Sequence, residues 1–521
     1  MTPRRARFPS IAVVLAVALL AILVASGAPA AGAGPRKPPS PSPTPTTTPP
    51  PSRTAQWVIN ENAKPGTSYW RIPAGTRKGI AGYADHISAT AGETIKLFVK
   101  TKSPSFHVEA YRLGYYQGLG GRLIWTSPEV ASARQPRVTI DPVTSMVRAP
   151  WNESLQVPIS STWVQGTYVL KLVSSDGGQA YIPFVVRNDT STADLVIQAE
   201  ATTWQAYNRW GGYSLYKGPE GTFESRSRAV SFDRPFGGRG AAGLLHELPF
   251  VVLVERLGLD VTYWTDVDLH QQPELLQNRS ALVSLDHDEY YSTRMRDGLT
   301  AARGSGVNLA FFGGNAIYRH IRFETSPLGP ERVMVSYKTA SEDPLLGIDD
   351  AEVTSSWRTG PMPRPESDIL GAMYACAGAH ADLVVDDADN WAFAGTGLAD
   401  GDHIQGLVNM EYDRVFPEAP TPANIQILAR SPTTCKGVPD YADMTYYTAQ
   451  SNAGVLDASS QGWVKALRCG DPIQADTCDA RAVRITQNIL DAFSAGPSGI
   501  AHPPVPNLAK FGITLQQPIN P

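Results

Sequence analysis

Short apolar segments in the C-terminal two-thirds of the chain are each followed by a run of polar and aromatic residues. The segments are Leu195–Ile197, Ala281–Leu285 and Val307–Phe312, and the runs behind them contain Tyr207, His287 with Glu289, and Asn315. In an open parallel sheet the carboxyl ends of the strands form one edge, and ligands bind in the crevice there. We therefore expect a phenol, an imidazole, a carboxylate and an amide to converge on one site that can hold a metal ion or move protons.

From Asp194 onward, short apolar strands alternate with helical patterns. We expect helices over 242–257 and Arg294–Gly304, with a strand near Val261–Trp264 between them. This alternation predicts a parallel sheet covered by helices on both faces. The expected domain spans residues 191–500, with a three-layer fold like that of glutamine amidotransferases or flavodoxins, irregular insertions between Glu324 and Ala394, and a Pro-rich tail over 501–521.

Residues 55–190 read as all-β. The expected strands are Thr94–Val99, Ser105–Arg112, Leu123–Thr126, Ser154–Pro158, Thr167–Leu172 and Ala180–Val186. Short β-branched runs separated by Gly, Pro, Ser and Asp are typical of a β-sandwich. The glycine-rich stretch 114–121 superficially resembles a phosphate loop, but no helical pattern follows it, so we interpret it as a hairpin.

The N-terminus has the pattern of a secretory signal over residues 1–33. Arg4, Arg5 and Arg7 precede the apolar run Ile11–Val24, and small residues follow at 28–30. The alternative is an uncleaved anchor, for which this run is short. Residues 34–54 are rich in Pro, Thr and Ser and predict an extended linker. We expect a secreted protein without a stable membrane span after cleavage, which the linker can tether at a cell surface.

The four cysteines all lie late in the chain. In an exported protein an even number favours disulfides, with Cys469–Cys478 as the local pair and Cys376–Cys435 as the other. The alternative, a zinc site, needs more closely paired cysteines. Basic (45) and acidic (49) residues nearly balance over 521 residues, and no basic stripe stands out, so we expect no nucleic-acid partner.

The stretch 311–315 has neither Ser nor Cys where an α/β-hydrolase or a glutamine amidotransferase places its nucleophile, which disfavours acyl-enzyme chemistry. His287 and Glu289 share one side of an extended backbone and can bind a metal or act as a base and its orienting group. The alternative is a helix N-terminus, where acidic residues favour the dipole. Tyr207 lies in an aromatic loop that can simply pack, or it can serve as a ligand to a hard trivalent cation.

Asn315 can fix a substrate carbonyl or a water molecule, or it can cap a helix that begins at Ala316. Glu411 follows an apolar stretch and can be a general base or the ion-pair partner of Arg414.

Five short motifs occur in a definite order along the chain. They are Tyr111-Arg112-Leu113-Gly114-Tyr115-Tyr116 with the following glycines, Gly166-Thr167-Tyr168, Gln205-Ala206-Tyr207-Asn208, His287-Asp288-Glu289 and Gly313-Gly314-Asn315. Together they resemble the large (beta) subunit of N,N-dimethylformamidase, in its C-terminal domain, and the family named after it. The resemblance covers most of the chain after the linker.

The resemblance implies hydrolysis of a small amide with a mononuclear non-haem ferric ion held by two tyrosines and one glutamate. It assigns Glu289 and Tyr207 as ligands, with Tyr168 as the second tyrosine. The alternative for Tyr168 is a structural tyrosine corner of a β-sandwich. His287 and Asn315 match positions that support the metal ligands or face the substrate, and the implied mechanism has them stabilise or orient the tetrahedral oxyanion. Glu411 resembles the catalytic base, although Met410 stands where the family has Trp.

The resemblance implies a hydrolase for a non-peptide C–N bond in a small amide or a polymer, and it leaves room for a homo-oligomer and a small partner subunit. Export and disulfides depart from the cytoplasmic family enzyme, so dimethylformamide itself is not the expected substrate. Two other functions are compatible with the sequence. One is a non-catalytic surface or carbohydrate-binding protein that uses aromatic loops, and the other is a glycan hydrolase with Glu289 and Glu411 as paired carboxylates.

Overall fold

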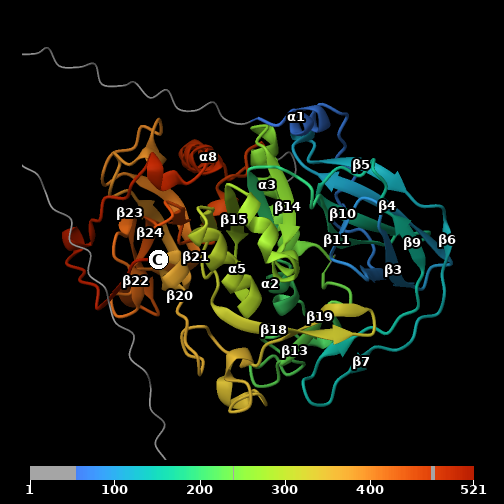
Figure 1. Cartoon of the computed structure of the whole chain (residues 1–521). Coiled ribbons are helices and arrows are strands. Elements are labelled where there is room, and N and C mark those ends of the chain that lie inside the picture. Colours follow the sequence, from blue (N-terminus) through green and yellow to red (C-terminus); the bar gives the residue numbers. More distant parts are fainter. Residues whose placement is uncertain (1–53, 239, 471–475) are drawn as a thin grey trace, which may run out of the picture. The chain divides into compact units, whose positions relative to one another are not determined.

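The computed structural model describes residues 54–238, 240–470 and 476–521 (Figure 1). The predicted signal peptide lies outside the described residues, as does all but the last residue of the predicted linker. Within the described ranges, no helix is long and apolar enough to cross a membrane.

The N-terminal third forms two sheets that share one hydrophobic core. Side chains from both sheets, such as Leu97, Phe106 and Leu170, are buried together. The first sheet has the order β1-β3-β9 and consists of β1 (Ile80–Ala84), β3 (Thr94–Thr101) and β9 (Leu155–Pro158). The second has the order β2-β11-β10-β4-β5 and consists of β2 (Ser88–Thr90), β11 (Gln179–Arg187), β10 (Gly166–Ser174), β4 (Ser105–Leu113) and β5 (Gly121–Thr126), with β6 (Val130–Ala131) paired to β4.

All six strands expected for this region are present. The glycine-rich stretch connects antiparallel β4 and β5 through the short 3-10 turn η1 (Tyr116–Gly118), which confirms the hairpin. Helix α1 (Gln56–Asn62) precedes the sheets, and β7 (Thr139–Ile140) pairs with β8 (Val147–Arg148).

The C-terminal region is built on a mostly parallel seven-stranded sheet with the order β14-β12-β15-β17-β25-β24-β23. The strands are β14 (Val261–Thr265), β12 (Leu195–Ala199), β15 (Ala281–Asp286), β17 (Asn308–Gly313), β25 (Gly454–Asp457), β24 (Val438–Thr448) and β23 (Gln426–Cys435). The first five are parallel, and β24 runs antiparallel to both of its neighbours. The protein is therefore a mixed α/β protein with several sheets.

Both faces of this sheet are buried, as the apolar strands predict. In β12, Leu195 and Ile197 pack in one core and Val196 in another. The first core also contains side chains of α3 (Ala242–Arg256) and α8 (Ala480–Ser494), and the second contains those of α5 (Thr293–Gly304). The other helices are α2 (Ala201–Tyr207), α4 (Asp266–Gln271), α6 (Ser367–Leu370) and α7 (Gly462–Lys465).

The region between Glu324 and Ala394 contains more regular structure than we expected. A four-stranded sheet joins β13 (Ala229–Ser231), β19 (Gly329–Val335), β18 (Arg319–Ser326) and β16 (Tyr290–Ser292), and β20 (Met373–Val384) pairs with β21 (His403–Arg414). The sequence hides part of this structure because some pairings join segments far apart in the chain, such as that of Ala229 with Val335. In the tail, β26 (Gln517–Ile519) pairs in parallel with β22 (Pro420–Pro422).

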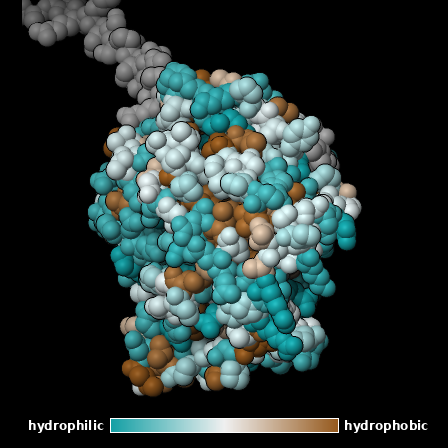
Figure 2. All heavy atoms as spheres, turned by 90° about the vertical axis from the view of Figure 1, so that its right-hand side faces the viewer, coloured by the Kyte–Doolittle hydropathy of each residue, from teal (hydrophilic) through white to brown (hydrophobic). Residues whose placement is uncertain are grey.

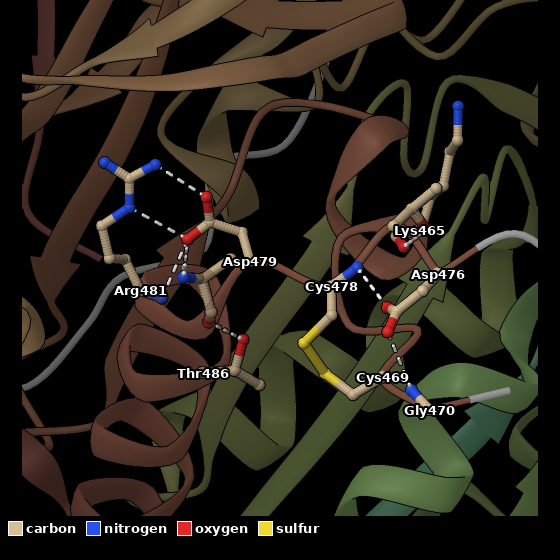
Figure 3. Close-up of a disulfide and its surroundings, with 10 residues drawn as sticks. Lys465, Cys469, Gly470, Asp476, Cys478, Asp479, Arg481 and Thr486 are labelled. Carbon is tan, nitrogen blue, oxygen red and sulfur yellow. Dashed lines mark hydrogen bonds and ion pairs between the residues drawn. A yellow bond between two sulfur atoms is a disulfide. The ribbon is translucent and has the colours of Figure 1, made fainter.

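Both expected disulfides are present. Cys376–Cys435 links β20 to the end of β23, and Cys469–Cys478 closes a short loop before α8 (Figure 3). Asp476 accepts a hydrogen bond from the backbone N–H of Cys478 beside this second disulfide, at 3.0 Å. Disulfides of this kind are typical of proteins from oxidising compartments.

Figure 2 shows the face of the molecule that carries several N-terminal strands. Hydrophobic residues there form small groups among hydrophilic ones. Scattered apolar residues of this kind are normal on a solvated surface.

Candidate functional site

The predicted site residues approach one another at one edge of the parallel sheet. His287 and Glu289 follow the end of β15, Asn315 follows β17, and Tyr207 is the last residue of α2, which follows β12. Glu411 comes from a different direction, on β21. The carboxyl ends of parallel strands thus deliver these side chains to the crevice where such sheets bind ligands.

Glu411 is the centre of the first group of contacts. Its Oε2 accepts a hydrogen bond from Asn315 Nδ2 at 2.6 Å and lies 3.1 Å from His287 Nε2. Asn315 Nδ2 and His287 Nε2 are 3.2 Å apart. Arg414, the alternative partner of Glu411, instead pairs with Asp440 at 3.3 Å. The arrangement is therefore a carboxylate, an imidazole and an amide in mutual contact.

Glu289 is the centre of the second group, which joins the first through His287. Its Oε2 accepts hydrogen bonds from the hydroxyls of Tyr207 at 3.2 Å and Tyr216 at 2.6 Å, and lies 3.4 Å from His287 Nε2. The two tyrosine rings stack with their centroids 4.3 Å apart. Arg319 contacts the other carboxylate oxygen of Glu289 at 3.3 Å. Two phenols and one carboxylate therefore bring three oxygens together.

The sequence analysis missed Tyr216 as a site residue. It lies nine residues after Tyr207 in the same aromatic stretch, and the intervening chain turns back so that both hydroxyls reach Glu289. The sequence signal was this aromatic stretch itself, but only the turn at residues 208–215 decides which tyrosine points inward.

A buried lysine extends the second group. Lys338 Nζ donates to the hydroxyl of Tyr290 at 2.5 Å, and that hydroxyl donates to the hydroxyl of Tyr216 at 2.7 Å. The ammonium nitrogen also lies 3.2 Å from the centroid of the Tyr216 ring. Burial lowers the pKa of Lys338 well below its ordinary value. The hydroxyl of Tyr216 is therefore fixed by Glu289 on one side and Tyr290 on the other.

Tyr168 lies elsewhere. It is a fully buried residue of β10 whose hydroxyl donates to the carbonyl of Val164 at 2.6 Å and whose ring stacks on Trp163. It belongs to the core that the two N-terminal sheets share. The structure therefore does not bring Tyr168 to Glu289, and a hydrogen bond of tyrosine to a backbone carbonyl a few residues upstream is typical of a tyrosine corner.

The backbone around the site is fixed by buried side chains. The N–H of His287 donates to Glu200 Oε2 at 3.0 Å, and the N–H of Asn315 donates to Asp413 Oδ1 at 2.8 Å. Asn315 and Met410 both have positive φ, at 60° and 64°. Non-glycine residues in this conformation cost free energy and often occur at functional sites. No helix begins at Ala316, so Asn315 does not act as a helix cap.

Charges around Glu289 keep it ionised. Burial alone would raise its pKa, but the neighbouring positive groups, among them His287 and Arg319, outweigh burial and lower it. Burial opposes protonation of His287, yet its hydrogen bond to Glu411 and the two nearby carboxylates raise its pKa. Burial raises the pKa of Tyr207, and the charge of Glu289 raises it further. The phenols are therefore protonated in the absence of a strong Lewis acid.

In the described ranges, no group of three or more His, Cys, Asp or Glu side chains is positioned to hold a metal ion. The group at Glu289 is of another kind, because two of its three oxygens are phenolic. Hard, anionic oxygens are the ligands preferred by hard cations such as ferric iron. The donor set of Tyr207, Tyr216 and Glu289 therefore fits such an ion chemically.

A pocket of about 530 Å³ borders the site. Tyr207 and His287 line it, together with Trp204, Phe236 and a glycine-rich segment that leads into α3. Tyr207 is 43% exposed, whereas Glu289 is 1% exposed. The site is thus reached from this side past Tyr207 and His287.

Comparison with known proteins gives one family. Residues 107–479 match the family described as N,N-dimethylformamidase beta subunit-like, C-terminal. No curated protein matches the chain.

Three solved structures are similar to parts of the chain. An uncharacterized protein from Bacillus anthracis str. Ames is 14% identical over 20% of this chain and 78% of its own, with a TM-score of 0.14. A β-glucuronidase from Faecalibacterium prausnitzii is 12% identical over 45% of this chain and 27% of its own, with a TM-score of 0.14. A cycloisomaltooligosaccharide glucanotransferase from Paenibacillus sp. is 8% identical over 60% of this chain and 63% of its own, with a TM-score of 0.16. These TM-scores are too low for the likenesses to carry an argument.

Proposed function

The chain belongs to the N,N-dimethylformamidase beta subunit-like family, and we propose that it is a metal-dependent hydrolase of a non-peptide amide C–N bond. The observation that carries this proposal is the junction of two groups at His287. One group is the oxygen cluster of Tyr207, Tyr216 and Glu289, and the other contains Glu411 and Asn315.

We propose that Tyr207, Tyr216 and Glu289 hold a mononuclear ferric ion. Tyr216 replaces Tyr168 in this set because its hydroxyl lies 2.6 Å from Glu289 Oε2, whereas that of Tyr168 is bonded to Val164 in another core. Bound there, a ferric ion supplies Lewis acidity toward the amide carbonyl or a water molecule. Two phenolates and one carboxylate balance its three charges.

The residues of the second group act on water and on the amide. Glu411, partly exposed on β21, accepts a proton from the attacking water. Asn315 Nδ2 and His287 Nε2 lie close enough together, at 3.2 Å, to donate hydrogen bonds to one developing oxyanion. The water oxygen bonds to the carbonyl carbon, the C–N bond breaks, and the nitrogen leaves with the proton. The products are a carboxylic acid and an amine.

We infer a β-sandwich over residues 55–190 and a three-layer domain of the glutamine-amidotransferase or flavodoxin type over 191–500. The two disulfides support secretion. A homo-oligomer, a small partner subunit and surface tethering stay predictions.

The two alternative functions receive less support. A glycan hydrolase with Glu289 and Glu411 needs no tyrosines beside its carboxylates, but Tyr207 and Tyr216 both contact Glu289. For a carbohydrate-binding protein the aromatic residues should be available for stacking, but Tyr116 is 0% exposed.

The proposal is tested by metal analysis and visible absorption of the chain purified without a histidine tag. We expect about one iron per chain and a tyrosinate-to-iron charge-transfer band. Tyr207→Phe and Tyr216→Phe should each weaken or abolish the band. Tyr168→Phe is the matched control and should keep it, because its hydroxyl bonds only to a backbone carbonyl among its described partners.

Two results would contradict the proposal. If the folded protein cannot be loaded with iron, the proposed metal site is wrong, and the non-catalytic carbohydrate-binding function is favoured. Loss of the band in a folded Tyr168→Phe variant, with the band intact in Tyr216→Phe, would return the second ligand to Tyr168.

A further inference from the structure

A pocket lies beside the proposed catalytic residues. It measures about 530 Å³, and Tyr207 and His287 form the wall that it shares with the site. Trp204 and Phe236 form its aromatic walls, with their rings in an edge contact at a centroid distance of 6.5 Å. The pocket is therefore continuous with the place where the amide would react.

We propose that the substrate carries a bulky, uncharged apolar group, such as an aromatic ring, which binds in this pocket while its amide lies at Tyr207 and His287. This inference rests on the proposed function and names the substrate class of that site. The expected substrate is therefore an amide with an aryl or branched-alkyl group, and not a formamide that carries only small substituents.

Volume supports a substrate of this size. A water molecule occupies about 30 Å³ in the liquid, so the volume of the pocket exceeds that of ten water molecules. A small dialkylformamide would leave most of the pocket unfilled. Pockets of roughly 300–1,000 Å³ are typical of sites that enclose larger organic ligands.

The walls are fixed and apolar. The indole N–H of Trp204 donates to Glu247 Oε1 at 2.7 Å, which holds the ring in place. Gly243 allows this position, because a Cβ there would lie only 2.0 Å from the Trp204 ring. A rigid aromatic wall loses little conformational freedom on binding, so burial of an apolar ring against it is favourable.

The charges that face the pocket disfavour an anionic substituent. Glu200 and Asp286 both line the pocket, and each is buried or half-buried. The lining has three groups that can be positive. Arg209 and His246 are exposed, with His246 3.9 Å from Asp286, and His287 lies at the wall shared with the site. Because His287 contacts the amide, a carboxylate at the far end of the substituent would lose its water against an apolar lining whose described residues offer no further buried cation to pair with, which costs free energy.

The test compares three formamides on the full chain loaded with iron. N-Methylformamide lacks the apolar group, N-benzylformamide carries it, and N-(4-carboxybenzyl)formamide adds a carboxylate to the same frame. Binding is measured by calorimetry, and release of formate is measured in parallel. We expect the benzyl compound to bind at least about ten-fold more tightly than the methyl compound, and the carboxybenzyl compound to lose that gain.

Two variants locate the effect. Ala242 is an exposed residue at the start of α3 that lines the pocket, so Ala242→Phe should fill it and abolish the preference for the benzyl compound. Phe236→Ala removes an aromatic wall and should weaken the preference. Ala301→Phe is the matched control, since Ala301 is an exposed helical alanine on α5 that does not line this pocket. It should change nothing.

The inference and the proposed function fail in different ways. Equal affinity for the benzyl and methyl compounds, or a preference that survives Ala242→Phe, would overturn the inference even if both compounds are hydrolysed. Tight, Ala242-dependent binding without formate release would uphold the pocket and contradict the hydrolase.

Discussion

Glu411 shows how much of this site depends on contacts between distant residues. Its Oε2 lies within hydrogen-bond distance of Asn315 Nδ2 and His287 Nε2, which are 96 and about 120 residues earlier in the chain. It is partly exposed, with 17% of its side chain accessible, whereas Glu289 is sealed from solvent. Two carboxylates a few ångströms from one imidazole are therefore in different environments, which suits a base that meets water and a ligand that does not.

We expect Glu411→Gln to lower kcat/KM for amide hydrolysis by about 100-fold or more, since an amide cannot accept the proton from water. The substitution keeps an oxygen for the hydrogen bond from Asn315, so iron content and the unfolding transition should stay unchanged. Steady-state kinetics and metal analysis check both expectations. Glu418→Gln, at an exposed glutamate on the same segment, is the control. An active Glu411→Gln enzyme would show that another group is the base.

The segment between Tyr207 and Tyr216 is held by a buried arginine. Arg234 is fully buried, and its guanidinium donates to the carbonyls of Asn208, Trp210 and Tyr213 at 3.1 Å each. Burial lowers the pKa of Arg234 to about 9. The planar guanidinium can reach several carbonyls at once, so it sets the curvature of the segment that presents both tyrosines.

We expect Arg234→Lys to destabilise the protein by about 3 kcal/mol, because an ammonium cannot satisfy all the buried carbonyls that the guanidinium bonds. The tyrosinate-to-iron band should shift or weaken, because the two phenols lose their fixed separation. Urea unfolding and visible absorption measure the two effects. The control is Arg209→Lys, at an exposed arginine in the same segment. An unchanged band in Arg234→Lys would show that the segment holds its shape without the guanidinium.

On the scale of the whole molecule, a buried ion pair fixes the N-terminal sheets to the α/β region. Arg112 of β4 contacts Glu255 of α3 through two nitrogens, and both side chains have 0% exposure. Tyr263 of β14 and Asn62 of α1 also donate to Glu255, at 2.7 Å and 3.0 Å. A buried charge pair that is fully hydrogen-bonded specifies one arrangement of these elements, since removal of either partner leaves an unpaired buried charge.

Two histidines that are buried as neutral rings should each make the folded state less stable as the pH falls below about 6.5. Burial lowers the pKa of both His270 and His320 to about 4. Above pH 6.5 neither is charged in either state. Between pH 6.5 and 4 the unfolded chain binds protons that the folded chain does not, so each histidine removes up to about 3 kcal/mol of stability in that window.

The contribution of His320 is isolated by urea unfolding of the parent and His320→Gln between pH 7.5 and 4.5. The loss of stability on acidification should be smaller in the variant, because glutamine does not take up a proton. His86→Gln, at an exposed histidine, should keep the full loss. Parallel pH profiles for the parent and His320→Gln would contradict a depressed pKa at His320.

Local sequence patterns were enough to predict several features of this protein. Period-two apolar runs marked the N-terminal strands, and strands such as Leu195–Ile197 alternating with helices marked the parallel sheet. Because the carboxyl ends of parallel strands share one edge, the sequence also predicted that Tyr207, Glu289 and Asn315 lie at one site. The pairing of the cysteines followed from their spacing and number, and the family followed from the order of five motifs.

Local patterns do not reveal which side chains within those motifs meet, because that depends on how distant segments pack. Tyr168 and Tyr216 are both tyrosines in aromatic stretches, and no local pattern separates them. Tyr168 points into a core shared by two sheets, whereas a turn held by Arg234 carries Tyr216 to Glu289. The strands between Glu324 and Ala394 were not predicted either, and one of them, β19, pairs with β13 from far earlier in the chain. The positions of these tyrosines and strands depend on pairing and burial between segments far apart in the chain. Local sequence patterns do not reveal such contacts.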